Sequence, residues 1–259
     1  MTAETLLGQF GQNQIAGFLL VLGRIGPLFA LAPLFSSRSI PARAKGLCAV
    51  GLSFGIAPIV LAGQDVPLDV LGYSELMLKE ILVGLGFAFS LAALFAAIST
   101  AGAFIDTLIG FSYGALVDPV TGNQSSVLTQ TYILVGIMVL IAIGGDQLMI
   151  KGLARSYDVV PLLDFPSLAP FVGGIQNAFS QVFLSALELA APVVLAIVIT
   201  DAAFGVVSRV VPQMNVFAVG FPAKVTVGLL IIGVSLPFAA GWIGDELERS
   251  VSTALQSLG

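Results

Sequence analysis

The stretch ILVGLGFAFSLAALFAAISTAGAFI, residues 81–105, carries no charged side chain. A helix needs about 20 predominantly apolar residues to cross the roughly 30 Å hydrocarbon core of a bilayer. These 25 residues exceed that length. They predict a membrane-spanning helix, and they indicate that the chain around them is an all-α membrane protein.

Four more runs contain at most one charged residue. In chain order they are 15–37, interrupted by Arg24, then 46–64, then 179–200, interrupted by Glu188, and finally 225–244. The sequence therefore predicts five spans. Residues 132–145 are also apolar, but this run is only 14 residues long before Asp146. A partial span, a re-entrant segment and a helix buried in protein all remain open for it.

The composition supports the same class. Hydrophobic residues make up 57% of the 259 residues and charged residues 10%, against about 25% charged in a soluble domain. The net charge of -5 is scattered, with no long block of like charges. This pattern predicts no nucleic-acid partner and no lipid-headgroup patch.

The residue inventory excludes most catalytic chemistry. The chain has no histidine and only one cysteine, Cys48, so Ser-His-Asp triads, His-ligated metals and thiolate clusters are ruled out. Gly84 and Gly86 lie inside an apolar run, where close helix packing explains them better than a nucleotide-binding loop. We therefore expect a non-enzymatic protein without a cofactor.

Prolines punctuate the apolar runs. They stand at Pro27, Pro33, Pro58, Pro192, Pro212, Pro222 and Pro237. We expect kinked or broken helices, because proline removes a backbone hydrogen bond. In lipid the freed backbone groups must be satisfied by neighbouring protein, so the pattern favours a chain packed within an assembly.

The connecting segments give partial information on topology. Residues 36–45 carry Arg38, Arg43 and Lys45, which places this segment at the cytoplasmic face by the positive-inside rule. The orientation of the C-terminus stays open. Residues 245–258 predict a short amphipathic helix, either a surface helix that ends the bundle or a docking element.

Six ionisable residues fall at or near membrane depth. They are Arg24, Asp106, Glu188, Asp201, Arg209 and Lys224. Each costs about 2.5–3.5 kcal/mol at a helix centre by insertion scales, so they require partners or water. Structural pairing is the favoured interpretation. The alternative is a proton- or ion-coupled secondary transporter that uses Asp201, Glu188 or Asp106 as its coupling site.

Residues 106–131 mix bulky apolar side chains with glycine and proline, so they cannot form one regular helix. Asp118-Pro119 followed by Thr121-Gly122-Asn123 is typical of turns. Irregular backbone at membrane depth is tolerated only inside protein or along a water-filled path. An external loop and a pore-lining plug are both consistent with this segment.

Several motifs together resemble one family. The most specific are Ala191-Pro192 leading to Asp201, then SRVVPQMNVF at 208–217 and GFPAK at 220–224. PARAK at 41–45 supports them, and the resemblance runs through nearly the whole chain in order. The chain resembles the FliR family of the type III secretion export apparatus, which flagella share with virulence-associated injectisomes. Its length favours the flagellar branch.

The resemblance implies an architecture and a set of partners. One membrane domain over residues 1–259 would form kinked helical hairpins in a hetero-oligomeric export gate. One FliR subunit would join several copies of FliP and FliQ in a closed helical pore for unfolded flagellar subunits, next to FlhB and FlhA. The gate would lie in the lipid of the bacterial inner membrane, at the flagellar basal body.

The resemblance also implies residue roles. The segment 106–122 corresponds to the family's central plug, with Asp106, Ile109, Phe111, Tyr113, Leu116, Asp118 and Pro119 as plug residues. The residues expected to make subunit and polar contacts are Arg24, Pro27, Arg43, Lys45, Glu188, Asp201, Arg209, Pro212, Gln213, Asn215 and Lys224. Subunit ratio, cargo specificity and open-state geometry do not follow from the sequence.

Overall fold

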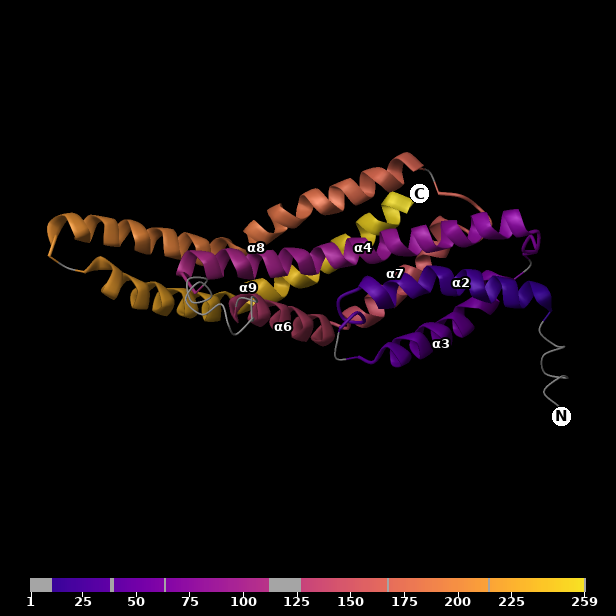
Figure 1. The fold of residues 1–259 in the computed structure, drawn as a ribbon, viewed down its shortest axis with the longest axis horizontal. Helices are drawn as coiled ribbons and strands as arrows, with labels where there is room; N and C mark the ends of the chain where they lie inside the picture. The colour runs from indigo at the N-terminus through magenta and orange to yellow at the C-terminus, as the bar shows by residue number, and fades with distance from the viewer. Residues whose placement is uncertain are drawn as a thin grey trace. The chain divides into compact units, whose positions relative to one another are not determined.

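The computed structural model describes residues 11–37, 40–62, 64–111, 127–166, 168–213 and 215–258. Within these ranges the regular structure consists of helices alone (Figure 1). They are α2 (Gln12–Leu31), α3 (Ala42–Val60), α4 (Val70–Ile109), α6 (Val127–Ala142), α7 (Gly145–Val159), α8 (Leu168–Val210) and α9 (Val216–Leu258). The predicted all-α class is confirmed.

Five of these helices, α2, α3, α4, α8 and α9, are long and apolar enough to cross a membrane. They correspond to the five predicted spans. The apolar run at 132–145 belongs to α6, which meets α7 at a bend of 72°. Gly144 lies at this bend with φ +69°, a left-handed conformation that glycine adopts without steric cost. The α6–α7 pair is therefore a broken span or a re-entrant segment.

Three helices are much longer than the spans predicted from hydropathy. α4 has 40 residues, and α8 and α9 have 43 each. At 1.5 Å per residue, 40 residues extend about 60 Å, roughly twice the hydrocarbon thickness. Residues 70–80, which precede the predicted span at 81–105, form the first turns of α4, and the expected short helix at 245–258 is the end of α9. Hydropathy marks where the apolar part stops, whereas Glu, Lys and Leu continue a helix without difficulty.

The prolines do not end the helices that contain them. α2 continues through Pro27 and α3 through Pro58. α8 continues through Pro192, and α9 through Pro222 and Pro237. The break in the apolar sequence comes at Gly144 instead, where the backbone turns without a proline.

The chain divides into two compact units, which we describe separately. Unit 1 comprises residues 1–92, 145–179 and 248–259. In it, α2 and α3 run side by side as a hairpin (Figure 1). Gly84 of α4 lies so close to the α2 backbone that an added Cβ would collide with the carbonyl oxygen of Arg24. An added Cβ at Gly86 would meet the Phe171 ring at 2.6 Å. Both glycines therefore serve helix packing, as predicted.

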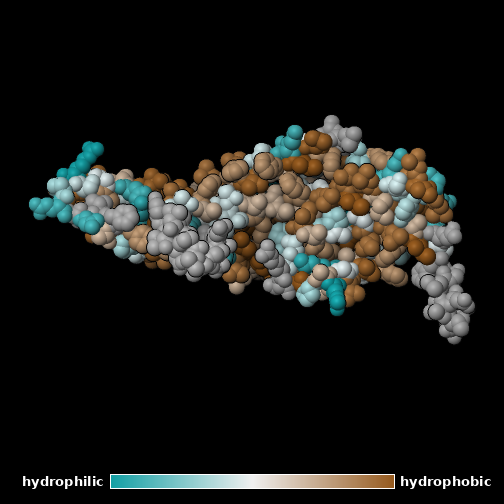
Figure 2. Space-filling view, viewed as in Figure 1, coloured by the Kyte–Doolittle hydropathy of each residue, from teal (hydrophilic) through white to brown (hydrophobic). Residues whose placement is uncertain are grey.

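Unit 2 comprises residues 93–144 and 180–247. The second part of α8 and the first part of α9 form an antiparallel hairpin in it (Figure 1). Asn215 caps α9, since its Oδ1 accepts a hydrogen bond from the Ala218 amide at 3.1 Å. Hydrophilic side chains gather at the tip of this hairpin and hydrophobic ones along its length (Figure 2). Exposed apolar residues such as Phe183 and Val234 make its sides suited to lipid or to other apolar helices.

The packing at Gly84 generates a stability prediction. Replacing Gly84 with Leu should lower the thermal unfolding midpoint in detergent, because overpacking against a backbone costs about 1–3 kcal/mol or more. Gly26→Leu is the matched control on α2, where an added Cβ meets nothing within 4 Å. Equal midpoints for the two variants would contradict the close approach of α4 to α2.

Candidate functional site

Unit 1 is organised around a buried arginine. Arg24 of α2 is fully buried, and so is its partner Glu80 of α4. The Arg24 guanidinium donates to the two carboxylate oxygens of Glu80, at 2.5 Å from Nε and 2.8 Å from Nη2. This bidentate geometry is the strongest arrangement available to an arginine and a carboxylate.

The remaining donors of Arg24 go to α7. Nη1 donates to the carbonyl and hydroxyl oxygens of Ser156 at 3.0 and 3.3 Å, and Nη2 donates to the Val160 carbonyl at 2.9 Å. The guanidinium also lies 4.0 Å from the centre of the Tyr157 ring. All five N–H donors of the side chain are thus used inside the chain, which removes the main cost of burying the charge.

Lys79 completes this cluster. It is 4% exposed, and its Nζ donates to Glu80 at 2.5 Å, to the Leu162 carbonyl at 2.6 Å and to the Pro161 carbonyl at 3.2 Å. The last carbonyls of a helix lack intrahelical partners and carry partial negative charge. Arg24 bonds the carbonyls of Ser156 and Val160 at the carboxyl end of α7, and Lys79 bonds the two carbonyls that follow, so the partial negative charge of these groups offsets the surplus cation.

The predicted contact residues included Arg24 but not Lys79 and Glu80, which precede the predicted span at 81–105. A signal was available, because an arginine inside an apolar run requires a carboxylate. Glu80 directly precedes the charge-free run that starts at Ile81. Its distance of 56 residues from Arg24 conceals the pairing in the sequence.

Unit 2 contains a cleft of about 550 Å³ at the end of α4. α4 contributes residues 107–110, and the α8–α9 hairpin contributes the opposite walls, including Phe204 and Phe221. Lys224 of α9 and Asp201 of α8 form an ion pair of 2.5 Å in this wall. Their side chains remain 27% and 45% exposed, so the pair is reached from the cleft. Asp201 of α8 and Lys224 of α9, both predicted to make polar contacts, are therefore paired with each other.

The predicted plug segment begins at this cleft. Asp106 and Ile109 are buried residues of α4, at 2% and 1% exposure. Gly110 ends α4 with φ 103°, and the amides of Gly110 and Phe111 both bond the Asp106 carbonyl. The Phe111 ring lies edge-on to Phe221, with centroids 6.5 Å apart. Tyr113, Leu116, Asp118 and Pro119 lie outside the described residues.

The other predicted contact residues occupy several positions. Glu188 accepts a hydrogen bond from the Trp242 indole at 3.3 Å within unit 2. At the hairpin tip the exposed residues are Arg209, Pro212, Gln213 and Asn215. In unit 1, Pro27 lies inside α2, and Arg43 and Lys45 lie in the first turn of α3. The structure therefore distributes the predicted set between the two units and does not form one site from it.

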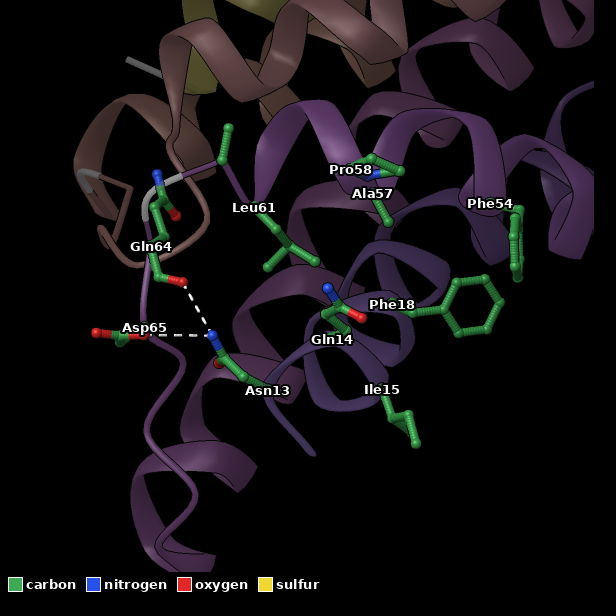
Figure 3. Close-up of a pocket in the computed structure, with 11 residues that line it drawn as sticks. Asn13, Gln14, Ile15, Phe18, Phe54, Ala57, Pro58, Leu61, Gln64 and Asp65 are labelled. Carbon is green, nitrogen blue, oxygen red and sulfur yellow. Dashed lines mark hydrogen bonds between the residues drawn. The ribbon is translucent and has the colours of Figure 1, made fainter. Parts of the chain in front are cut away.

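A second cavity, of about 760 Å³, lies in unit 1 between the start of α2 and the end of α3. Phe18 and Phe54 pack edge to face at its apolar end, with centroids 5.7 Å apart (Figure 3). Asn13 holds the polar end, where its Nδ2 donates to the Gln64 carbonyl at 3.1 Å and to Asp65 at 3.4 Å (Figure 3). Asn13 Oδ1 also accepts from the Val66 amide at 2.7 Å, so this residue fastens the α2–α3 hairpin at that end.

In the described part of the chain, no group of three or more His, Cys, Asp or Glu side chains could hold a metal ion. The fold and these clefts define a helical membrane protein built on intrachain ion pairs. A family model described as bacterial export proteins, family 1, matches residues 15–250. The chain belongs to this family.

The chain is also similar to individual members. It is 33% identical over 225 residues to the flagellar biosynthetic protein FliR of Bacillus subtilis (strain 168), with 85% of each chain covered. It is 30% identical over 217 residues to FliR of Escherichia coli (strain K12), covering 84% of this chain and 83% of the relative. The surface presentation of antigens protein SpaR of Shigella sonnei is 29% identical over 222 residues, with 83% and 84% covered. The predicted membership of the FliR family is confirmed.

The buried cluster generates a second prediction. Glu80→Gln should destabilise the protein by about 3–5 kcal/mol, because Arg24 then keeps its charge without a counter-ion. The double variant Arg24→Leu with Glu80→Leu should recover much of this loss. Thermal unfolding in detergent measures both effects. Glu75→Gln, an exposed position on the same helix, is the matched control. A Glu80→Gln protein as stable as this control would show that the pair contributes little.

Proposed function

We propose that this chain is the FliR-type subunit of the flagellar type III protein export gate, a non-enzymatic component in the bacterial inner membrane. In this proposal it assembles with FliP and FliQ into a closed helical pore, next to FlhB and FlhA. Unfolded flagellar subunits are the cargo. The gate belongs to the flagellar basal body.

The unit 2 cleft carries the proposal. There α4 ends at Gly110 and the chain enters the predicted plug segment beside the Asp201–Lys224 pair of the α8–α9 hairpin. A plug has to be anchored to a rigid frame, and buried Asp106 and Ile109 anchor its first residues in α4. Family membership over residues 15–250 supports a role in export. Relatives named as flagellar proteins favour the flagellar branch.

A secondary transporter would need an intramembrane acid available for a coupling ion. Asp201 is paired with Lys224, and Glu188 accepts the Trp242 hydrogen bond. These two acids therefore serve the hairpin, which favours a structural role over ion coupling.

The proposed assembly is tested by gentle detergent extraction followed by mass measurement of the intact particle. We expect a hetero-oligomer that contains this chain with FliP- and FliQ-type subunits. A monomer without partners would overturn the proposal.

Single variants at the exposed hairpin tip sharpen this test. Arg209→Ala should reduce the recovery of partners, because its charge is available for contacts outside the chain. Arg249→Ala removes an exposed cation from α9 outside that tip and serves as the control. Equal recovery of partners with both variants would remove Arg209 from the proposed interface.

The plug role is tested by deleting residues 112–122, which leaves α4 and its Gly110 cap intact. We expect the assembled complex, reconstituted in vesicles, to conduct ions that the wild-type complex retains. The amount of assembled complex is measured in parallel, so that failed assembly is distinguished from an open pore. Unchanged conductance in a fully assembled complex would show that this segment does not obstruct the pore.

A further inference from the structure

A groove of about 530 Å³ in unit 1 lies between the end of α2, the first half of α3 and α7. Its walls are mostly apolar: the rings of Phe29 of α2 and Phe35 are in contact at a tilt of 50°, with centroids 5.0 Å apart, and Ile56 of α3 and Ile150 of α7 extend the lining. Such a surface is suited to a hydrocarbon chain or to an apolar side chain of a partner.

Two glycines keep this groove open. Gly51 and Gly55 belong to its lining, and a Cβ added at either position would meet nothing within 4 Å. These glycines therefore do not serve a close contact inside the chain, in contrast to Gly84. Cys48, the only cysteine of the chain, is exposed in the same lining.

One end of the groove is cationic. Lys45 belongs to the lining, and its Nζ donates to the Ser36 carbonyl at 2.8 Å, which leaves two of its three donors for another acceptor. Arg43, two residues before Lys45 in the first turn of α3, is exposed and lies outside the lining, and the described residues give neither cation a salt bridge. The sequence has no acid between Glu4 and Asp65 that could neutralise this end locally.

We propose that this groove binds an anionic phospholipid, with an acyl chain along Gly51 and Gly55 and the phosphate at Lys45 and Arg43. A lipid supplies a long apolar chain and a negative charge in one molecule, which matches the two ends of the groove. The positive-inside rule places the 36–45 segment at the cytoplasmic face, where lipid phosphates are within reach of its cations. A partner helix would match both ends of the groove only if it placed an acidic side chain at the cationic end.

The scattered charge of the sequence predicted no lipid-headgroup patch. The groove differs from that expectation because its apolar walls and its cations come from α2, the following turn, α3 and α7. The cavity at the opposite end of the α2–α3 hairpin provides a contrast, because its polar end carries Asp65 and no cation (Figure 3). Anionic lipid is therefore expected at one end of the hairpin only.

The labelling rate of Cys48 measures whether the groove is occupied, and no cysteine has to be introduced for this experiment. The purified full chain is placed in nanodiscs of phosphatidylcholine alone or with added phosphatidylglycerol, and the rate of maleimide labelling is measured. We expect phosphatidylglycerol to slow the labelling of Cys48, and we expect soluble glycerol phosphate to leave it unchanged. Native mass spectrometry after mild detergent should show retained phosphatidylglycerol.

Two sets of variants, three that remove a charge and two that add a side chain, separate the charge of the groove from its shape. Each of Lys45→Gln and Arg43→Gln should weaken phosphatidylglycerol retention about five-fold, the effect of one cation near a lipid phosphate. Arg249→Gln, a cation outside the groove, should not. Gly55→Leu keeps every charge and fills the groove, whereas Gly46→Leu adds the same side chain at an open glycine of α3 outside the lining. Of these two glycine variants, Gly55→Leu should abolish the protection of Cys48 by phosphatidylglycerol, and Gly46→Leu should leave it unchanged.

Weakened phosphatidylglycerol retention in Lys45→Gln and Gly55→Leu, with both controls at wild-type levels, supports the proposal. Equal retention in all variants overturns it. Protection of Cys48 by partner subunits in pure phosphatidylcholine, with a cross-link from Cys48 to one of them, also overturns it and assigns the groove to a protein helix. Thermal unfolding of each variant confirms that it is folded. The outcomes measured on the purified chain alone do not depend on whether the export proposal holds.

Discussion

Burying Arg24 is the constraint on which unit 1 depends. A guanidinium in an apolar interior is tolerated only when its charge and all its donors are matched. Here Glu80 supplies the charge and the carboxyl end of α7 supplies the carbonyls. The three helices α2, α4 and α7 must therefore be positioned so that Arg24, Glu80 and the carboxyl end of α7 lie at the same level and face one another. Gly84 permits this meeting, because any larger residue would hold α4 away from the Arg24 backbone.

α7, which supplies carbonyls to Arg24, follows a sharp bend. α6 and α7 turn by 72° at Gly144, and this turn ends one apolar helix and begins an amphipathic one. The carboxyl end of α7 then presents Ser156 and Val160 to Arg24, and the next two carbonyls to Lys79.

Much of the architecture could be predicted from the sequence, because hydrocarbon thickness acts on local composition. Each of the five apolar runs corresponds to one of the five helices that are long and apolar enough to cross a membrane, and the prediction that Gly84 and Gly86 serve helix packing is confirmed. Helix ends could not be predicted in the same way, since α4 and α9 continue into charged sequence. The pairing of charged residues was the hardest feature to predict from the sequence. Arg24 and Glu80 are 56 residues apart, and only the fold shows that Asp201 pairs with Lys224.

The two ion clusters differ in a way that bears on function. The Arg24 cluster is closed, since its donors are used within the chain and no water reaches it. The Asp201–Lys224 pair is open to a cleft, and exposed ion pairs contribute little to stability on their own, about 0–1 kcal/mol. A partly exposed pair beside apolar walls is free to exchange partners when another surface arrives. Unit 1 is thus held by its own chain, whereas the hairpin of unit 2 retains polar groups that an assembly would complete.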